Sequence, residues 1–225
     1  MGMEPLKSEP PRWKRLVKRL VPARLQEHLR ELRELSSAER RAHLGATLRR
    51  FASTQATVPP SLDASGSILF VCYGNIIRSA LAAALTRRHA AALDITFDRV
   101  RSAGLAARAG READARAVAA GRALGVDLTS HRAQPVDRAL VDDAAVIYVM
   151  DRMNEAQLLA RFPDAAPKLR RLGALAMTED GDVIEDPYVL DAAAVAAVAE
   201  RIDRATRELV VELARRASDD RSRAR

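Results

Sequence analysis

The chain has 225 residues, 48% of them hydrophobic, which is enough for one α/β domain with a full core and an additional segment. It contains no apolar run of the about 18 residues that a membrane-spanning helix needs, no secretory signal and only one cysteine. We therefore expect a cytoplasmic protein without an internal disulfide. Residues 1–52 carry 13 Lys or Arg against 6 Glu, whereas the remaining 24 basic and 24 acidic residues cancel. This distribution argues against nucleic-acid binding by the larger, later part of the chain.

Residues 1–51 are predicted to form a basic, amphipathic helical extension. Apolar residues recur there at the spacing of one helix face, at Trp13, Leu16, Val17, Leu20 and Val21 and again at Leu25, Leu29 and Leu32. Ser36 followed by Glu39 fits a capping box that would start a third helix. That helix would carry an apolar stripe at Leu44, Leu48 and Phe51. We expect the helices to pack on the following domain or on a second copy of the chain. Contact of residues 12–51 with a membrane surface is the alternative, because Trp13 lies among basic residues.

Residues 52–66 are rich in Ser, Thr, Pro and Gly and form the predicted linker to a domain at 67–218. In that domain short apolar stretches alternate with helical ones, and residues 219–225 are predicted to be a disordered tail. The expected strands are 68–71, 95–101, 144–150 and 168–174, and the expected helices are 77–91, 112–124, 152–162 and 191–217. Such alternation predicts a parallel sheet with helices on both faces, which binds ligands beyond the carboxyl ends of its strands.

The only cysteine, Cys72, follows the first predicted strand and precedes an arginine, Arg78, by five intervening residues. Gly74 and Asn75 tolerate the left-handed backbone that directs successive amides at one anion. The stretch from Ser79 onward favours a helix, whose N-terminus stabilises both phosphate and thiolate. A lone cysteine is more often a buried small hydrophobe, but this spacing favours a thiolate nucleophile on a phosphate-binding loop.

The sequence resembles the low-molecular-weight protein tyrosine phosphatases, whose signature is a Cys-x-Gly-Asn-x-x-Arg-Ser loop. The match continues in chain order through Ser102-Ala-Gly104, Asp114-Ala-Arg116, His131-Arg-Ala-Gln134, Met150-Asp-Arg-Met-Asn154 and Glu185-Asp186-Pro187-Tyr188. It covers residues from about 67 to 216 and leaves the first sixty or so unmatched. The resemblance implies a flavodoxin-like, four-stranded parallel sheet preceded here by the helical extension.

The resemblance also implies roles for the loop residues. Cys72 would attack phosphorus, and Arg78 would bind two phosphate oxygens with its planar fork. Ser79 would donate a hydrogen bond to the sulfur. Asn75 would pin the loop, with His131 supporting it. The complete phosphate-binding set would be Tyr73, Gly74, Asn75, Ile76, Ile77, Arg78 and Ser79.

The leaving group needs a proton, and Asp186 is the expected general acid, because Pro187 makes its loop rigid and the family places its acid there. The same carboxylate, once deprotonated, would activate water to hydrolyse a phosphocysteine intermediate. An isolated Asp-Pro usually only begins a turn, but the complete loop upstream favours the catalytic interpretation.

The chain departs from the family pattern around the substrate. Residues 105–109 contain no aromatic side chain, so one wall of the phenol slot is missing, and Tyr73 and Tyr188 remain as the expected substrate walls. Ile77 stands where many members have a second cysteine. Ile76 matches phosphotyrosine members, whereas related arginine phosphatases have Thr there.

The predicted function is hydrolysis of phosphomonoesters, with phosphotyrosine in a protein or a small aryl phosphate as substrate. One alternative is a phosphate-binding regulatory module with little turnover, which the presence of both Cys72 and Asp186 disfavours. Another is an arsenate reductase-like enzyme, which would need further cysteines. We expect no cofactor and no metal, because the four histidines show no ligand spacing.

Overall fold

The computed structural model describes residues 35–52, 57–59, 62, 66–95, 97, 99–176 and 181–223; the predicted helices before residue 35 lie outside this range. Four parallel strands form one sheet in the order β2, β1, β3, β4. The strands are β1 (Ile68–Cys72), β2 (Val100–Gly104), β3 (Val146–Val149) and β4 (Leu169–Arg171). The predicted four-stranded α/β fold is therefore confirmed.

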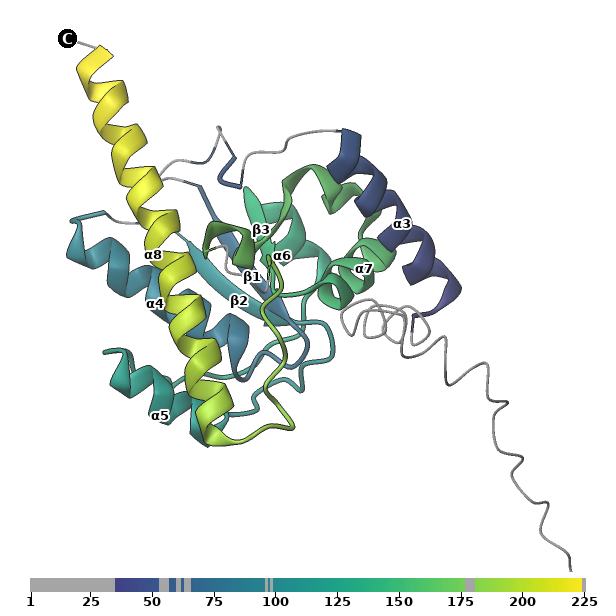
Figure 1. The fold of residues 1–225 in the computed structure, drawn as a ribbon, viewed down its shortest axis with the longest axis horizontal. Helices are drawn as coiled ribbons and strands as arrows, with labels where there is room; N and C mark the ends of the chain where they lie inside the picture. The colour runs from purple at the N-terminus through teal and green to yellow at the C-terminus, as the bar shows by residue number, and fades with distance from the viewer. Residues whose placement is uncertain are drawn as a thin grey trace, which may run out of the picture.

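Helices cover both faces of the sheet (Figure 1). They are α3 (Ser37–Ala52), α4 (Arg78–Ala92), α5 (Ala115–Ala123), α6 (Arg138–Asp143), α7 (Arg152–Arg161) and α8 (Ala192–Arg223). Two short 3-10 helices, η1 (Pro163–Lys168) and η2 (Leu172–Ala176), flank β4. Helices α4, α5 and α8 pack on one face, and α3, α6 and α7 pack on the other.

The central strand β1 consists of five buried residues, as expected for a parallel strand that is covered on both sides. Ile68 and Phe70 face the α4 and α8 side, whereas Leu69 and Val71 face the α6 and α7 side. β1 lies between β2 and β3 and ends at Cys72, so the strand places this side chain at the carboxyl edge of the sheet.

The predicted capping box at the start of α3 is confirmed. The Ser36 amide donates to a Glu39 carboxylate oxygen at 2.6 Å, and the Glu39 amide donates to Ser36 Oγ at 3.3 Å. The predicted apolar face is wrong for Leu44, which is 60% exposed, because the helix turns Ala46 toward α7 instead. The side chains of residues 48–51 lie outside the described part. For α3, packing on the domain is the arrangement observed.

The predicted linker is partly packed against the domain. Val58 and Leu62 are buried in the core, and the carbonyls of Val58 and Pro59 accept hydrogen bonds from Arg216 of α8 at 3.1 and 2.8 Å. α8 continues to Arg223, so residues 219–223 are helical and the predicted disordered tail is wrong there. The strand predicted at 168–174 ends at Arg171, and η2 begins at the next residue, Leu172.

The second strand lies later than predicted. A strand is predicted at 95–101, but β2 begins only at Val100 and ends at Gly104. The amide of Ile95 instead donates to the Ala90 carbonyl at the end of α4. Helix α6 was not predicted at all. Among the described residues, no helix is long and apolar enough to cross a membrane.

Candidate active site

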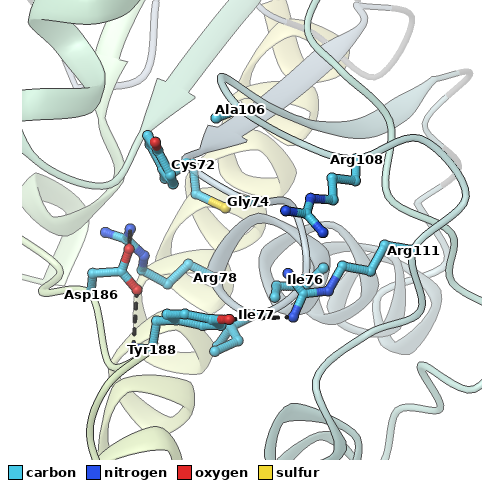
Figure 2. Close-up of a pocket in the computed structure, with 11 residues that line it drawn as sticks. Cys72, Gly74, Ile76, Ile77, Arg78, Ala106, Arg108, Arg111, Asp186 and Tyr188 are labelled. Carbon is cyan, nitrogen blue, oxygen red and sulfur yellow. Dashed lines mark hydrogen bonds and ion pairs between the residues drawn. The ribbon is translucent and has the colours of Figure 1, made fainter.

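A cavity of about 580 Å³ opens at the carboxyl end of β1, next to Cys72 (Figure 2). Three segments line it: the loop between β1 and α4, the loop after β2, and the segment before α8. The lining residues are Cys72, Tyr73, Gly74, Ile76, Ile77, Arg78, Ala106, Arg108, Arg111, Asp186 and Tyr188. The three predicted catalytic residues therefore share one cavity, although Asp186 lies far along the chain from Cys72 and Arg78.

The Cys72 sulfur lies at the N-terminal end of α4. Ser79 Oγ is 3.0 Å from the sulfur, and the amide of Asn75 donates to the sulfur at 3.3 Å. The Ser79 hydroxyl also donates to the Ala103 carbonyl at 3.3 Å, so both that oxygen and the sulfur lie within reach of its proton. No side chain caps α4, so its first amides are free of side-chain partners at the end where an anion is stabilised. These groups lie where they can stabilise negative charge on the sulfur during the reaction.

Asn75 holds the loop in shape from beneath the cavity. Its φ of +54° lies in the left-handed region that asparagine tolerates better than most residues. Its Nδ2 donates to Ser79 Oγ and to Ser102 Oγ, each at 2.9 Å, and its Oδ1 accepts from the Gln134 amide at 2.9 Å. Asn75 and Ser79 are fully buried and do not line the cavity.

His131 contacts Asn75, as the family resemblance implied. Its Nε2 donates to the Asn75 carbonyl at 2.7 Å, which fixes the ring proton on that nitrogen because a carbonyl can only accept. Burial lowers the pKa of His131, the hydrogen bond to Asn75 opposes this, and the nearby charges of Arg87 and Arg132 lower it further. The neutral ring is therefore favoured.

Arg78 is 2% exposed and is held by two carboxylates. Its Nη1 donates to Asp151 Oδ2 at 2.6 Å and to the Ile184 carbonyl at 3.1 Å, and its Nη2 pairs with Asp186. Burial opposes the charge of this guanidinium, but attraction from Asp151, and then from Cys72 and Asp186, outweighs burial and raises its pKa. Arg78 is thus a permanent cation facing the cavity.

The segment that carries Asp186 is tied to the domain. Asp186 Oδ1 accepts from the Tyr188 amide at 3.2 Å. Arg116, at the start of α5, donates to the Tyr188 carbonyl at 3.0 Å and also binds the Leu190 carbonyl. Asp114 fixes Arg116 in turn, with two contacts of 2.8 Å.

The expected substrate walls, Tyr73 and Tyr188, both line the cavity and are about half exposed, at 50% and 48%. The wall that the sequence left without an aromatic residue is occupied by Ala106, Arg108 and Arg111. Arg108 and Arg111 lie across the cavity from Asp186, with Arg111 against the Tyr188 ring (Figure 2).

Sequence reasoning missed the contributions of Asp151, Arg108 and Arg111. Asp151 stands in a stretch that resembles the family, but its side chain also caps α7 by accepting from the Asn154 amide at 2.6 Å. A helix cap explains an Asp at that position, so no separate pattern in the sequence indicates its contact with Arg78. No signal in the residue pattern points to the two arginines.

Comparison with known proteins agrees with the geometry. A sequence profile described as low molecular weight phosphotyrosine protein phosphatase matches residues 67–219. A probable low molecular weight protein-tyrosine-phosphatase, EpsP of Ralstonia solanacearum, is 36% identical over 122 residues, which cover 54% of this chain and 78% of that protein. A protein-arginine-phosphatase of Geobacillus stearothermophilus is 33% identical over 121 residues, covering 54% and 78%.

The fold is also similar to solved structures. The tyrosine phosphatase Wzb from Escherichia coli K30, in complex with sulphate, is 28% identical with a TM-score of 0.60, covering 66% of this chain and 99% of that one. A mutant of YwlE from Bacillus subtilis is 26% identical with a TM-score of 0.61, covering 66% and 99%. This chain belongs to the low molecular weight phosphotyrosine protein phosphatase family and is a cysteine-dependent phosphomonoester hydrolase.

Proposed function

We propose that the chain hydrolyses phosphotyrosine in proteins, or a small aryl phosphate, through a phosphocysteine intermediate. The observation that carries the proposal is the convergence of Cys72, Arg78 and Asp186 on one cavity with tyrosine side chains at its edge. Cys72 and Arg78 stand at the bottom of the β1 to α4 loop, and Tyr73 and Tyr188 offer ring surfaces to an aromatic leaving group.

In the first step, the Cys72 thiolate attacks phosphorus. The sulfur–phosphorus bond forms while the bond from phosphorus to the aryl oxygen breaks, and Asp186 gives its proton to that oxygen. Arg78 and the loop amides hold the phosphoryl oxygens throughout. Because Asp186 binds the same guanidinium, the incoming phosphate replaces this contact and frees the carboxyl for the leaving oxygen.

In the second step, the ionised Asp186 takes a proton from water, and the resulting hydroxide oxygen bonds to phosphorus. The sulfur–phosphorus bond breaks, inorganic phosphate leaves, and Ser79, 3.0 Å from the sulfur, stabilises the restored thiolate. Each cycle returns the proton to Asp186, so no further reactant is needed.

Phosphoarginine is the second candidate substrate, because a protein-arginine-phosphatase is among the similar proteins. Two features favour the aryl substrate. Ile76, at a position where arginine phosphatases have Thr, lines the cavity, and Arg108 and Arg111 place positive charge where a guanidinium leaving group would lie. Turnover of matched phosphotyrosine, phosphoserine and phosphoarginine peptides decides between the candidates, and we expect the phosphotyrosine peptide to react fastest.

The mechanism is tested first at the nucleophile. We expect Cys72→Ser to reduce turnover of nitrophenyl phosphate to background, because a serine hydroxyl is far less ionised and less nucleophilic. A circular dichroism spectrum unchanged from wild type shows that the fold is retained. Activity close to wild type in this variant would disprove the thiolate mechanism, and absence of activity in the wild type would favour a regulatory module.

The acid is tested with a series of leaving groups. Asp186→Asn is expected to slow phenyl phosphate hydrolysis roughly a hundredfold or more, but nitrophenyl phosphate much less, because a good leaving group needs little protonation. The matched control is Glu185→Gln, since Glu185 is exposed and is not among the residues that line the cavity. Equal losses across the series would remove Asp186 from the role of general acid.

Cytoplasmic location, and contact of residues 12–51 with a membrane surface or a second copy, stay predictions. They can be tested by cell fractionation and by sedimentation of the full chain with vesicles of anionic lipid.

A further inference from the structure

The loop after β2 contributes two guanidinium groups to the cavity in place of the aromatic wall. Arg108 and Arg111 both line it, on the side opposite Asp186 (Figure 2). Arg111 stacks over the Tyr188 ring, with 5.8 Å from its Cζ to the ring centroid, and its Nη2 donates to the Tyr188 hydroxyl at 3.4 Å. The Arg111 contact uses one of five N–H donors, so the remaining donors are available.

Neither of these two charges has an ion-pair partner in the described part of the chain, although Asp114, whose pKa is lowered chiefly by Arg116, also attracts Arg111. The Arg108 guanidinium has no hydrogen-bond or ion-pair partner in the described part of the chain, and Arg111 has only the tyrosine. The carboxylate of Asp114 is occupied by Arg116 through both of its oxygens. The third cation of the cavity, Arg78, is already paired with Asp151 and Asp186.

This local excess of positive charge does not follow from the composition of the domain. Beyond residue 52 the basic and acidic residues are equal in number, at 24 each. A neutral domain that gathers two unpaired guanidinium groups beside its nucleophile concentrates positive potential there, and a cavity with low-dielectric walls strengthens such a field.

The loop that carries the two arginines is fixed to the domain. The amides of Leu105 and Ala106 donate to the carbonyls of Cys72 and Tyr73, each at 2.9 Å. At its other end the Gly110 amide donates to the Ala133 carbonyl at 2.8 Å, and the Ala133 amide donates back to Arg111 at 2.8 Å. Gly110 permits this turn, with a φ of +79°. These backbone hydrogen bonds hold the part of the loop that carries both arginines beside the cavity.

We propose that Arg108 and Arg111 form an anion subsite that binds a second negatively charged group of the substrate, a carboxylate or a phosphate on a residue beside the phosphorylated one. The subsite rests on the proposed function, because it selects among phosphorylated peptides that enter this cavity. The phosphotyrosine ring would pack on Tyr188, and Arg111 already lies at the hydroxyl end of that side chain. A planar guanidinium binds carboxylate and phosphate in a two-pronged manner, so either group fits.

The test compares three peptides of equal length that carry one phosphotyrosine flanked by alanines, by glutamates, or by alanines and a second phosphotyrosine. Their Kd values are measured by fluorescence anisotropy with the full-length Cys72→Ala chain, which cannot accept the phosphoryl group. We expect the two acidic peptides to bind roughly tenfold more tightly than the alanine peptide, because two exposed charge pairs each give up to about fivefold. The advantage should shrink as salt is added.

In the Cys72→Ala background, the double substitution Arg108→Gln with Arg111→Gln should remove the tighter binding of the acidic peptides. The control is Arg122→Gln, which should leave it intact, because Arg122 is an exposed residue on α5 outside the cavity lining. Ratios of kcat/KM for the same peptides with the otherwise wild-type chain give a second measurement. Equal Kd values for all three peptides, or an advantage that survives the double substitution, would overturn the subsite. Failure of the wild type to hydrolyse any of them would instead contradict the proposed function, and the Kd comparison would still decide the subsite.

Discussion

Arg78 joins three segments of the site through one side chain. Burying an unpaired guanidinium costs several kcal/mol, and here Asp151, Asp186 and the Ile184 carbonyl compensate for its burial. The two carboxylates are not equivalent, because the Asp186 side chain is 42% exposed and that of Asp151 only 15%. We therefore expect Asp151 to stay in place when phosphate binds and Asp186 to be the partner that moves.

Replacing Arg78 by Lys keeps the charge but removes the planar fork. A lysine cannot contact Asp151 and two phosphate oxygens together, so we expect kcat/KM for nitrophenyl phosphate to fall roughly a hundredfold or more. Arg138→Lys is the matched control, since Arg138 is exposed and pairs with Asp142 and Asp164 far from the cavity lining. Turnover near the wild-type value in Arg78→Lys would mean that charge alone suffices at this position.

The sequence predicted the site residues that belong to one local motif. It missed the residues that reach the cavity only through the tertiary fold. Cys72, Gly74, Asn75 and Arg78 lie within one short loop, where spacing alone limits the possible chemistry. Arg108 has alanines close to it in the sequence. Only the path of its loop in the structure shows that it lines the same cavity as Cys72. Long-range placement of this kind depends on tertiary packing that no local pattern encodes.

At the scale of elements, β2 shows why a local pattern can mislead. Ser102, Ala103 and Gly104 have low strand propensity, so no local pattern indicates a strand at these residues. The ladder with β1 outweighs propensity, pairing Cys72 with Gly104. A Cβ on Gly104 would lie 2.7 Å from the Tyr73 carbonyl, so glycine is required where the catalytic loop passes closest. The strands β1 and β3, with continuous apolar runs, were predicted within a few residues.

The segment from Asp186 to Leu190 has no regular secondary structure apart from a turn, and Arg116 is its main tie to α5. We expect Arg116→Gln to loosen this segment and to misplace Asp186. Because a misplaced acid matters most for poor leaving groups, phenyl phosphate hydrolysis should fall roughly tenfold or more and nitrophenyl phosphate hydrolysis much less. The leaving-group series measures this.

The control for Arg116 is Arg215→Gln on α8. Arg215 also forms an exposed pair with a carboxylate, that of Glu212, but lies outside the cavity lining. A purely structural role for Arg116 would lower the melting temperature without changing the dependence on the leaving group. That result would contradict the positioning role.

At the scale of the whole molecule, two histidines whose neutral form is favoured lie at separate sites in the fold. His131 supports the catalytic loop, and His89 lies between α4 and α8, where its Nε2 is 2.9 Å from Asp203 Oδ1. Asp203 already pairs with Arg88 and Arg207. Burial lowers the pKa of His89; Asp203 opposes this, but the two arginines add to the lowering.

These lowered pKa values predict how stability depends on pH. As the pH falls through about 6.5, the unfolded chain binds protons at both histidines and the folded chain does not, so the free energy of unfolding decreases. The decrease ends once the pH passes below the folded-state pKa values, where both states are protonated. Paired carboxylates such as Asp114, whose pKa is also lowered, act only in a more acidic range, near or below about 4.

Urea unfolding at a series of pH values measures this dependence. His131→Gln and His89→Gln should each flatten the decrease between neutral and mildly acidic pH, because each removes one group that the unfolded chain protonates. A double substitution should flatten it further, since the two sites lie in different parts of the fold and share no partner. Stability that stays constant or rises on mild acidification would show that the folded chain binds these protons as readily as the unfolded chain. Both rings would then be charged in the folded chain, and the prediction of lowered pKa values would be wrong.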